Sequence, residues 1–212
     1  MASAVIIDYG VGNVGAVANM IRRVGGDAVV SRDPGEIREA DRIILPGVGA
    51  FDRAMEQLRG AGVIDVLSEC VLERRTPLLG VCVGMQILGA GSEEGQEPGL
   101  GWIKAHVERF RQPREGFAMR VPQMGWNLLR HARTDPLLAG FEAGDFYLYF
   151  LHSYHMVCED TANVVAWTRY GYDFPSLVRS GNIWGVQGHP EKSHRFGMAL
   201  FRNFLAEVRN AS

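Results

Sequence analysis

The feature that most constrains the fold of this chain is an alternation of short apolar runs with helical patterns. In the first half, apolar runs of strand length lie at residues 4–8, 28–31, 42–45 and 77–81. Helical patterns lie between them, including one at about 13–24 that Asn13 can cap, and others at 50–58 and 63–75. Continuous apolar strands that alternate with helices predict an α/β fold, with a mostly parallel central sheet covered by helices on both faces. In such sheets, ligands bind at the carboxyl ends of the strands.

The second half has a different pattern, with strand-like segments and no long helices between them. These segments lie at residues 102–110, 146–151, 164–168, 175–178 and 183–187, and a last amphipathic helix is expected at about 194–208. We expect this half to add antiparallel strands to the sheet. The chain has 212 residues and no visible repeat or linker, so residues 1–212 are predicted to form a single domain.

Charge and cysteine content narrow the class of protein. With 22 basic and 24 acidic side chains, the chain is not expected to bind nucleic acid or an anionic membrane. Its first residues lack the pattern of a secretory signal, and no apolar run approaches the roughly 18 residues of a membrane span. Three cysteines are an odd number for a disulfide framework, so a cytoplasmic protein with at least one working thiol is expected.

Cys82 is the best candidate for that thiol. Residues 78–86 (LLGVCVGMQ) place it between an apolar strand and the start of a helix, with Gly80 and Gly84 on either side. This pattern is typical of a nucleophile elbow, a sharp turn that needs small neighbours and lifts its apex side chain out of the sheet. The start of a helix also favours a thiolate. Most cysteines are simply small buried apolar residues, but the flanking glycines favour the nucleophile here.

A possible base for this thiol lies far along the chain. Residues 183–192 (IWGVQGHPEK) end a strand near His189, and Glu191 follows across a proline. Thiol chemistry needs a base to move a proton, and the base needs a carboxylate to orient it. We therefore predict a Cys82, His189 and Glu191 triad. Taken alone, His189 would be interpreted as a hydrogen-bonded histidine at a strand end and Glu191 as a solvated loop charge. The other histidines and cysteines lack metal-ligand spacing, so no metal is expected.

Together these two segments resemble the class I (triad) glutamine amidotransferases, whose motifs are a glycine-flanked cysteine and a His-Pro-Glu segment. Further segments narrow the resemblance to the glutaminase subunits of imidazole glycerol phosphate synthase; they lie at 46–51 (PGVGAF), 124–127 (MGWN), 149–154 (YFLHSY) and 189–193 (HPEKS). The landmarks span positions 8 to 193. The resemblance implies hydrolysis of L-glutamine to glutamate and ammonia through a thioester, without a cofactor. It also implies a heterodimer with a (β/α)₈ barrel synthase that receives the ammonia for histidine biosynthesis.

The resemblance also implies roles for residues beyond the triad. Oxyanion donors would come from Val83 and from the peptide between Gly47 and Val48, which flanking glycines allow to rotate when the partner docks. The substrate-binding residues would be Gln86, Glu94, His152 and Ser153. The partner interface would include Gly12, Asn13, Trp126, Tyr149 and Lys192, with Trp126 on a loop at 124–127. The ordinary alternatives are a flexible turn at 46–49, surface positions for Gln86 and Glu94, and a core position for Trp126.

Two positions depart from the family pattern, and some alternatives stay open. Gln123 stands where a histidine commonly precedes the MGWN segment, and is expected to alter the partner-facing surface. Gly188 stands where an aromatic residue commonly precedes His-Pro-Glu, and is expected to loosen the strand that carries His189. Segments 180–187 and 193–197 also resemble paralogous subunits that serve bacterial surface-sugar amidation, so the ammonia acceptor is open. A stand-alone cysteine hydrolase and a catalytically silent interaction protein are the other possible functions.

Overall fold

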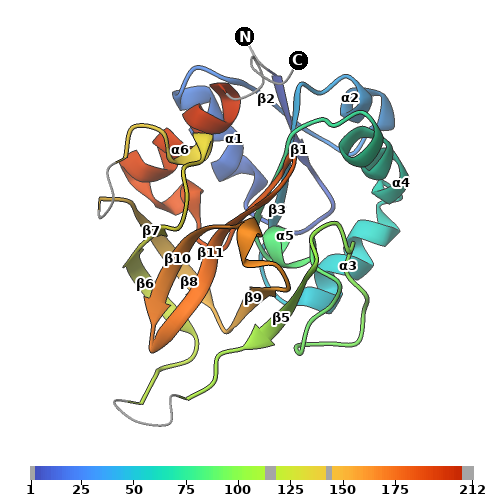
Figure 1. The fold of residues 1–212 in the computed structure, drawn as a ribbon. Helices are drawn as coiled ribbons and strands as arrows, with labels where there is room; N and C mark the ends of the chain where they lie inside the picture. The colour runs from blue at the N-terminus through green and yellow to red at the C-terminus, as the bar shows by residue number, and fades with distance from the viewer. Residues whose placement is uncertain (1–2, 113–117, 142–144, 207–212) are drawn as a thin grey trace.

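The computed structural model describes residues 3–112, 118–141 and 145–206 (Figure 1). Its centre is an eight-stranded sheet of order β2-β1-β3-β4-β12-β11-β10-β7. The strands are β1 (Ser3–Ile7), β2 (Asp27–Ser31), β3 (Arg42–Gly47), β4 (Leu78–Cys82), β7 (Arg130–His131), β10 (Val164–Tyr170), β11 (Tyr172–Ser180) and β12 (Ile183–Val186). Strands β1 to β4 and β12 pair in parallel, and β11, β10 and β7 are added antiparallel. The predicted fold class is confirmed.

Helices cover this sheet on both sides. They are α1 (Val14–Arg23), α2 (Pro34–Arg38), α3 (Phe51–Gly60), α4 (Ile64–Ser68), α5 (Val83–Gln86) and α6 (His194–Ala206). Figure 1 shows α1 and α6 on one side and α2, α3 and α4 on the other. The helix expected at 63–75 is instead α4 followed by a π-helical turn, Glu69–Glu73. Residues 207 and 208 of the last expected helix lie outside the described residues.

Two separate ribbons stand beside the main sheet. β5 (Ala105–Arg109) pairs with β9 (Tyr154–Cys158), and β6 (Gln123–Leu128) pairs with β8 (Tyr147–His152), both antiparallel. The expected loop at 124–127 is therefore wrong, because this segment lies within β6. A glycine and the short run of apolar residues conceal the strand in the sequence, and cross-strand pairing with β8 stabilises it.

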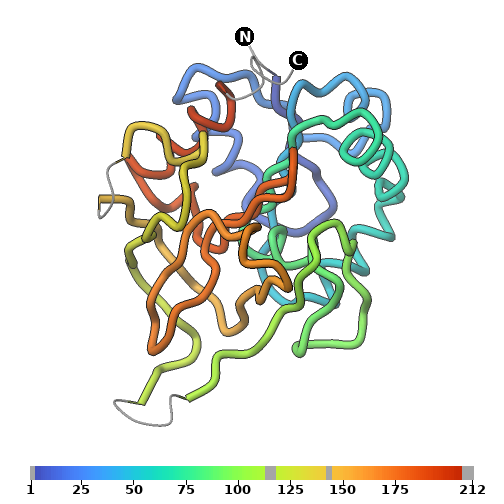
Figure 2. The backbone as a smooth tube through the Cα atoms, viewed as in Figure 1, coloured from blue at the N-terminus to red at the C-terminus, as the bar shows by residue number. Residues whose placement is uncertain are grey.

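The order of the strands determines where a site can form. Strand β12 comes late in the chain and lies between β11 and β4. In the backbone trace of Figure 2, orange and red segments from late in the chain cross the centre of the molecule near blue and green ones from its first half. The register places Val186 beside Val81, and Gly47 beside Cys82. The carboxyl ends of β3, β4 and β12 therefore meet at one edge, where α/β sheets bind ligands. Within the described part of the chain, no helix is both long and apolar enough to cross a membrane.

The two departures from the family pattern have structural explanations that differ from those expected. Gln123 is only 2% exposed, so it does not form part of the surface. Gly188 lies beyond the end of β12 and is buried against β8, where an added Cβ would be 2.8 Å from the Cβ of Leu148. Gly188 therefore permits close packing with β8 and does not loosen a strand.

Candidate active site

Cys82 occupies a strained turn between β4 and α5. Its φ of 55° and ψ of −113° lie in a region that residues with a side chain rarely adopt. A Cβ on Gly84 would overlap the carbonyl oxygen of Leu45, so the turn can pack against β3 only with glycine there. This is the geometry of the predicted elbow. Helix α5 has only four residues, so its end polarises the sulfur less than a long helix would.

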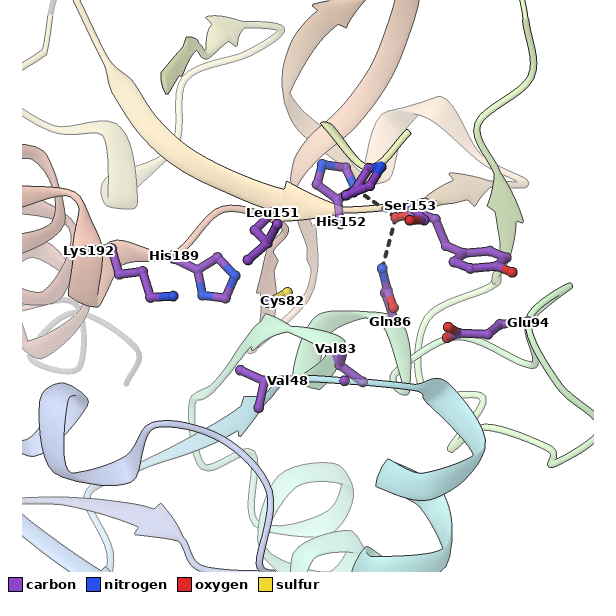
Figure 3. A pocket seen from close by; sticks show the side chains of 13 residues that line it. Val48, Cys82, Val83, Gln86, Glu94, Leu151, His152, Ser153, His189 and Lys192 are labelled. Carbon is purple, nitrogen blue, oxygen red and sulfur yellow. Dashed lines mark hydrogen bonds between the residues drawn. The ribbon is translucent and has the colours of Figure 1, made fainter. Parts of the chain in front are cut away.

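His189 and Glu191 lie beside this turn and contact each other. His189 Nδ1 is 2.9 Å from Glu191 Oε1, and both side chains are about 3% exposed. The bond to Glu191 leaves the other ring nitrogen for Cys82, towards which the ring lies in Figure 3. Burial disfavours the charged ring, but hydrogen bonds with Cys82 and Glu191 outweigh it and raise the pKa of His189 to about 10. The structure thus brings the three predicted triad residues together.

The main chain of His189 is fastened to β8. Its N–H donates to the Tyr149 carbonyl at 2.8 Å. The Ser193 hydroxyl donates to the His189 carbonyl at 2.6 Å and accepts from the Tyr149 N–H at 2.9 Å. Sequence reasoning gave Ser193 no role of its own, although it ends the quoted His-Pro-Glu segment. These bonds fix the main chain that carries His189, and Glu191 orients the ring.

The triad opens into a cavity of about 500 Å³. Its lining consists of Val48, Gly49, Cys82, Val83, Gln86, Glu94, Pro122, Leu151, His152, Ser153, Tyr154, His189 and Lys192. All four residues expected to bind substrate are in this lining. Glu191 is not among the lining residues and contacts His189 Nδ1 instead. Within residues 3–112, 118–141 and 145–206, no group of three or more histidine, cysteine or acidic side chains could hold a metal ion.

Glu94 connects the cavity to helix α3. Its carboxylate accepts from the N–H of Phe51 at 2.8 Å, and its own N–H donates to the Ser92 hydroxyl at 3.1 Å. Phe51 is the first residue of α3, and the preceding Ala50 has no side chain that could cap the helix. Glu94 therefore supplies the missing cap while facing the cavity (Figure 3).

The segment expected to supply an oxyanion donor lies against the elbow. A Cβ on Gly47 would overlap the Gly84 nitrogen and would lie 2.9 Å from Val83 Cβ. Gly49 has a φ of 88°, a conformation that glycine adopts readily. Val48, between them, is exposed and lines the cavity. The two glycines thus have different roles, since one permits close packing and the other permits the turn.

Three of the residues expected to face a partner, Trp126, Tyr149 and Lys192, lie together, and Lys192 also lines the cavity. Trp126 is 46% exposed, which excludes a core position. Its ring stacks on His194 at 5.6 Å and meets Tyr149 edge-on at 6.2 Å, and Lys192 Nζ is 6.0 Å from the Tyr149 ring. The stacked His194 was not singled out from the sequence.

Gly12 and Asn13 lie in the turn between β1 and α1. The side chain of Asn13 accepts from the N–H of Ala16 at 3.3 Å, which confirms it as the cap of α1. Gly12 packs on Pro46, where an added Cβ would be 2.8 Å from the proline Cβ. This turn is therefore held next to the carboxyl end of β3.

Two further groups near Cys82 were not identified from the sequence. Gln187 is fully buried, and its Nε2 is 3.8 Å from Cys82 Sγ. The hydroxyl of Tyr9 donates to the Pro46 carbonyl, and burial together with the charge of Cys82 raises the pKa of Tyr9. Gln187 lies two residues before His189, which is the only local signal that could have identified it.

Comparison with known proteins decides the family. The sequence profile for "Glutamine amidotransferase class-I" matches residues 5–208. The chain belongs to the class I glutamine amidotransferases. The match covers almost the whole chain. Of the three functions that the sequence left open, it therefore favours the glutamine amidotransferase over a stand-alone cysteine hydrolase and a catalytically silent interaction protein.

Relatives of this amidotransferase share a name. The chain is 47% identical to "Imidazole glycerol phosphate synthase subunit HisH 2" of Pseudomonas aeruginosa, over 96% of this chain and 99% of the relative. It is 45% identical to the protein of the same name from Methanococcus maripaludis, over 96% and 98%. It is also 45% identical to "Imidazole glycerol phosphate synthase subunit HisH" of Leptospira borgpetersenii, over 95% and 98%.

Solved structures share the fold of this amidotransferase. One described as "glutamine amidotransferase" superposes with a TM-score of 0.74 at 24% identity, over 97% of this chain and 98% of the other. Another glutamine amidotransferase, from Thermotoga maritima, gives a TM-score of 0.69 at 14% identity, over 99% of each chain.

Proposed function

We propose that this amidotransferase is the glutaminase subunit of an imidazole glycerol phosphate synthase and supplies ammonia for histidine biosynthesis. The observation that carries the proposal is the meeting of Cys82, His189 and Glu191 at a cavity of about 500 Å³. The acceptor is proposed from the names of relatives at 45–47% identity that match nearly the full chain. The chain would act as one cytoplasmic domain.

The first half of the reaction forms a thioester. The Cys82 sulfur attacks the side-chain carboxamide carbon of glutamine, and the carbonyl electrons move to oxygen. The N–H of Val83 and the peptide between Gly47 and Val48 are the proposed donors to this oxyanion. When the tetrahedral intermediate collapses, the C–N bond breaks, and His189 donates a proton to the departing nitrogen so that ammonia leaves.

The second half restores the thiolate. Water attacks the thioester carbon while His189 takes one of its protons, and the C–S bond breaks to release glutamate. Glu191 would keep His189 in the orientation that both steps need, since its carboxylate accepts from Nδ1. No atom of Glu191 contacts the reacting carbon in this scheme.

The other cavity residues are suited to hold an amino acid. The Glu94 carboxylate is a suitable partner for the ammonium group of glutamine. Gln86, His152 and Ser153 line the same cavity and would complete the substrate site. Val48 and Gly49 line the same cavity, so the proposed oxyanion segment would lie next to the bound glutamine.

The exposed cluster of Trp126, Tyr149 and Lys192, with Gly12 and Asn13, is the proposed docking face. A synthase subunit with a (β/α)₈ barrel would bind there as a heterodimer and receive ammonia through the interface. Ammonia released without an acceptor is lost, so we expect the site to hydrolyse glutamine efficiently only when the synthase is bound. The peptide between Gly47 and Val48 is the proposed gate, with its N–H presented only in the docked state.

The test is glutamine turnover by the isolated chain, by the chain with its barrel synthase, and by both with the ammonia acceptor present. We expect little turnover alone and the highest turnover with partner and acceptor. A pull-down would identify the natural synthase. Stimulation by a surface-sugar synthase alone would overturn the histidine assignment, and full turnover by the isolated chain would overturn the gate.

A further inference from the structure

We propose that Gln187 is a further catalytic residue, whose side-chain amide donates an N–H to the Cys82 sulfur and stabilises it as a thiolate. This inference rests on the proposed function of Cys82 as the nucleophile. Gln187 follows β12 and is fully buried, and its Nε2 lies 3.8 Å from Sγ, a suitable separation for a hydrogen bond to sulfur. The two residues are brought together by the parallel pairing of β12 with β4.

The orientation of the Gln187 amide is fixed by its neighbours. The carbonyl oxygen of Tyr154 can only accept a hydrogen bond, so the Gln86 atom 3.0 Å from it must be the NH₂ group. The same Gln86 nitrogen lies 3.1 Å from Gln187 Oε1, which must therefore be the accepting oxygen. Exchanging the oxygen and nitrogen of Gln187 would place two NH₂ groups against each other. The group that faces Cys82 is consequently the donor.

The Tyr154 carbonyl, from which the hydrogen bonds of Gln86 and Gln187 are oriented, accepts a second hydrogen bond. His152 Nδ1 is 2.7 Å from the Tyr154 carbonyl, which thus accepts from both His152 and Gln86, as the converging dashed lines in Figure 3 show. Burial lowers the pKa of His152 to about 3, so its ring is neutral and carries its proton on the nitrogen that faces this carbonyl. His152, Gln86 and Gln187 therefore form one ordered series of bonds that ends at the sulfur.

A donor in this position favours the charged form of the nucleophile. A hydrogen bond to a thiolate is stronger than one to a neutral thiol. His189 contacts the sulfur as well, and it provides the positive charge. Helix α5 has only four residues, so its end contributes little to this stabilisation. Gln187, directly after the neighbouring strand β12, supplies a donor instead.

The same contacts could serve packing alone, so the test must separate the two roles. We would measure the rate of alkylation of Cys82 by iodoacetamide as a function of pH, using the full chain. Gln187→Met has a similar size and no donor, and Gln187→Glu replaces the donor with an acceptor. Gln123→Met is the matched control, because Gln123 is also a buried glutamine but does not line the cavity. Cys82→Ala gives the background from Cys70 and Cys158.

We expect Gln187→Met to be alkylated about tenfold more slowly than wild type near pH 6, with the difference disappearing at alkaline pH, where the sulfur is ionised in both proteins. The pH midpoint of the reaction should move up by about one unit, since a tenfold loss of thiolate corresponds to that shift. Gln187→Glu should move it further in the same direction. Gln123→Met should leave it unchanged.

An unchanged midpoint in a folded Gln187 variant would overturn the inference, as would an equal loss of rate at every pH. Thermal unfolding of each variant identifies those that fold, and Gln187→Glu provides the test if Gln187→Met does not. Alkylation requires no glutamine, so it reports on Gln187 even if the wild-type chain proves not to hydrolyse glutamine. Failure of the proposed function and failure of this inference are therefore distinguishable.

Discussion

Gly47 and Cys82 are register partners at the carboxyl ends of β3 and β4, so the proposed oxyanion segment lies directly beside the nucleophile. The approach is close because Gly47 has no side chain. A Cβ there would overlap the Gly84 nitrogen and crowd Val83. The segment at 46–49 can therefore lie against the Cys82 turn only because residue 47 is a glycine.

Gly47→Ala should both destabilise the protein and impair glutamine hydrolysis. The added carbon overlaps main-chain atoms that cannot rotate away, and overpacking of this kind costs about 1–3 kcal/mol. Gly60→Ala is the control, since a Cβ there meets nothing within 4 Å. Urea unfolding and glutamine turnover measure the two effects. Equal behaviour of the two variants would refute the close-packing argument.

Cys82→Ala should abolish glutamine hydrolysis while leaving the fold and partner binding intact. The sulfur is the proposed nucleophile, and a smaller side chain fits the same turn. Cys158→Ala and Cys70→Ala should retain turnover, because neither thiol lines the cavity. Turnover is measured with the synthase partner present, and circular dichroism checks the fold. Near-normal activity of Cys82→Ala would show that Cys82 is not the nucleophile and that the proposed triad is wrong.

Glu191→Gln should reduce turnover less than His189→Ala. The glutamine variant keeps the base and loses only the carboxylate that orients it, whereas the alanine variant removes proton transfer, which typically contributes about 10²- to 10⁴-fold. Steady-state glutamine turnover with the partner compares the two. An undiminished rate in Glu191→Gln would exclude Glu191 from the site, and equal complete losses would indicate a more direct role for it.

His152 should make the protein less stable in acid. Burial lowers the pKa of His152 from 6.5 to about 3, so the unfolded chain takes up this proton below about pH 6.5 and the folded chain does not. Stability is therefore present above pH 6.5 and is lost as the pH falls towards 3. Between pH 6.5 and 5 the loss from this one group should be about 2 kcal/mol.

Urea unfolding at several pH values tests this contribution. His152→Gln should show a shallower loss of stability with falling pH than wild type, whatever its stability at pH 7. The exposed His106 provides the control, and His106→Gln should follow the wild-type slope. Parallel curves for wild type and His152→Gln would show that His152 takes up a proton in the folded state as easily as in the unfolded one.

Trp126→Ala should weaken synthase binding by at least about 2 kcal/mol without unfolding the chain, because large exposed aromatic residues often dominate an interface. The side chain is 46% exposed and is held by His194 and Tyr149, so it is already ordered for docking. Leu72→Ala is the control, since Leu72 is another exposed apolar residue and lies in the π-helical turn after α4. Calorimetric titration with the purified synthase measures both. Unaltered binding by Trp126→Ala would show that the synthase does not dock on the face that contains Trp126.

The sequence by itself determined the elements whose cause is local. Continuous apolar runs separated by helical patterns predicted β1 to β4. Burial on both faces explains the runs of β1, β3 and β4, whereas β2 is an edge strand and most of its residues are exposed. The glycines around Cys82 indicated a tight turn, and the two-residue spacing of His189 and Glu191 placed a carboxylate within reach of the ring. The family motifs then assigned residues to the cavity.

Only the tertiary structure decided how distant segments meet. The ribbon of β6 and β8 depends on pairing between strands that are weak alone, so 124–127 resembled a loop. Gln187 reaches Cys82 across 105 positions of sequence, and its amide is oriented by Gln86, which lies on another element. Such contacts depend on the register of β12 against β4 and on side-chain conformations. Neither the register nor the conformations can be predicted from a local sequence pattern.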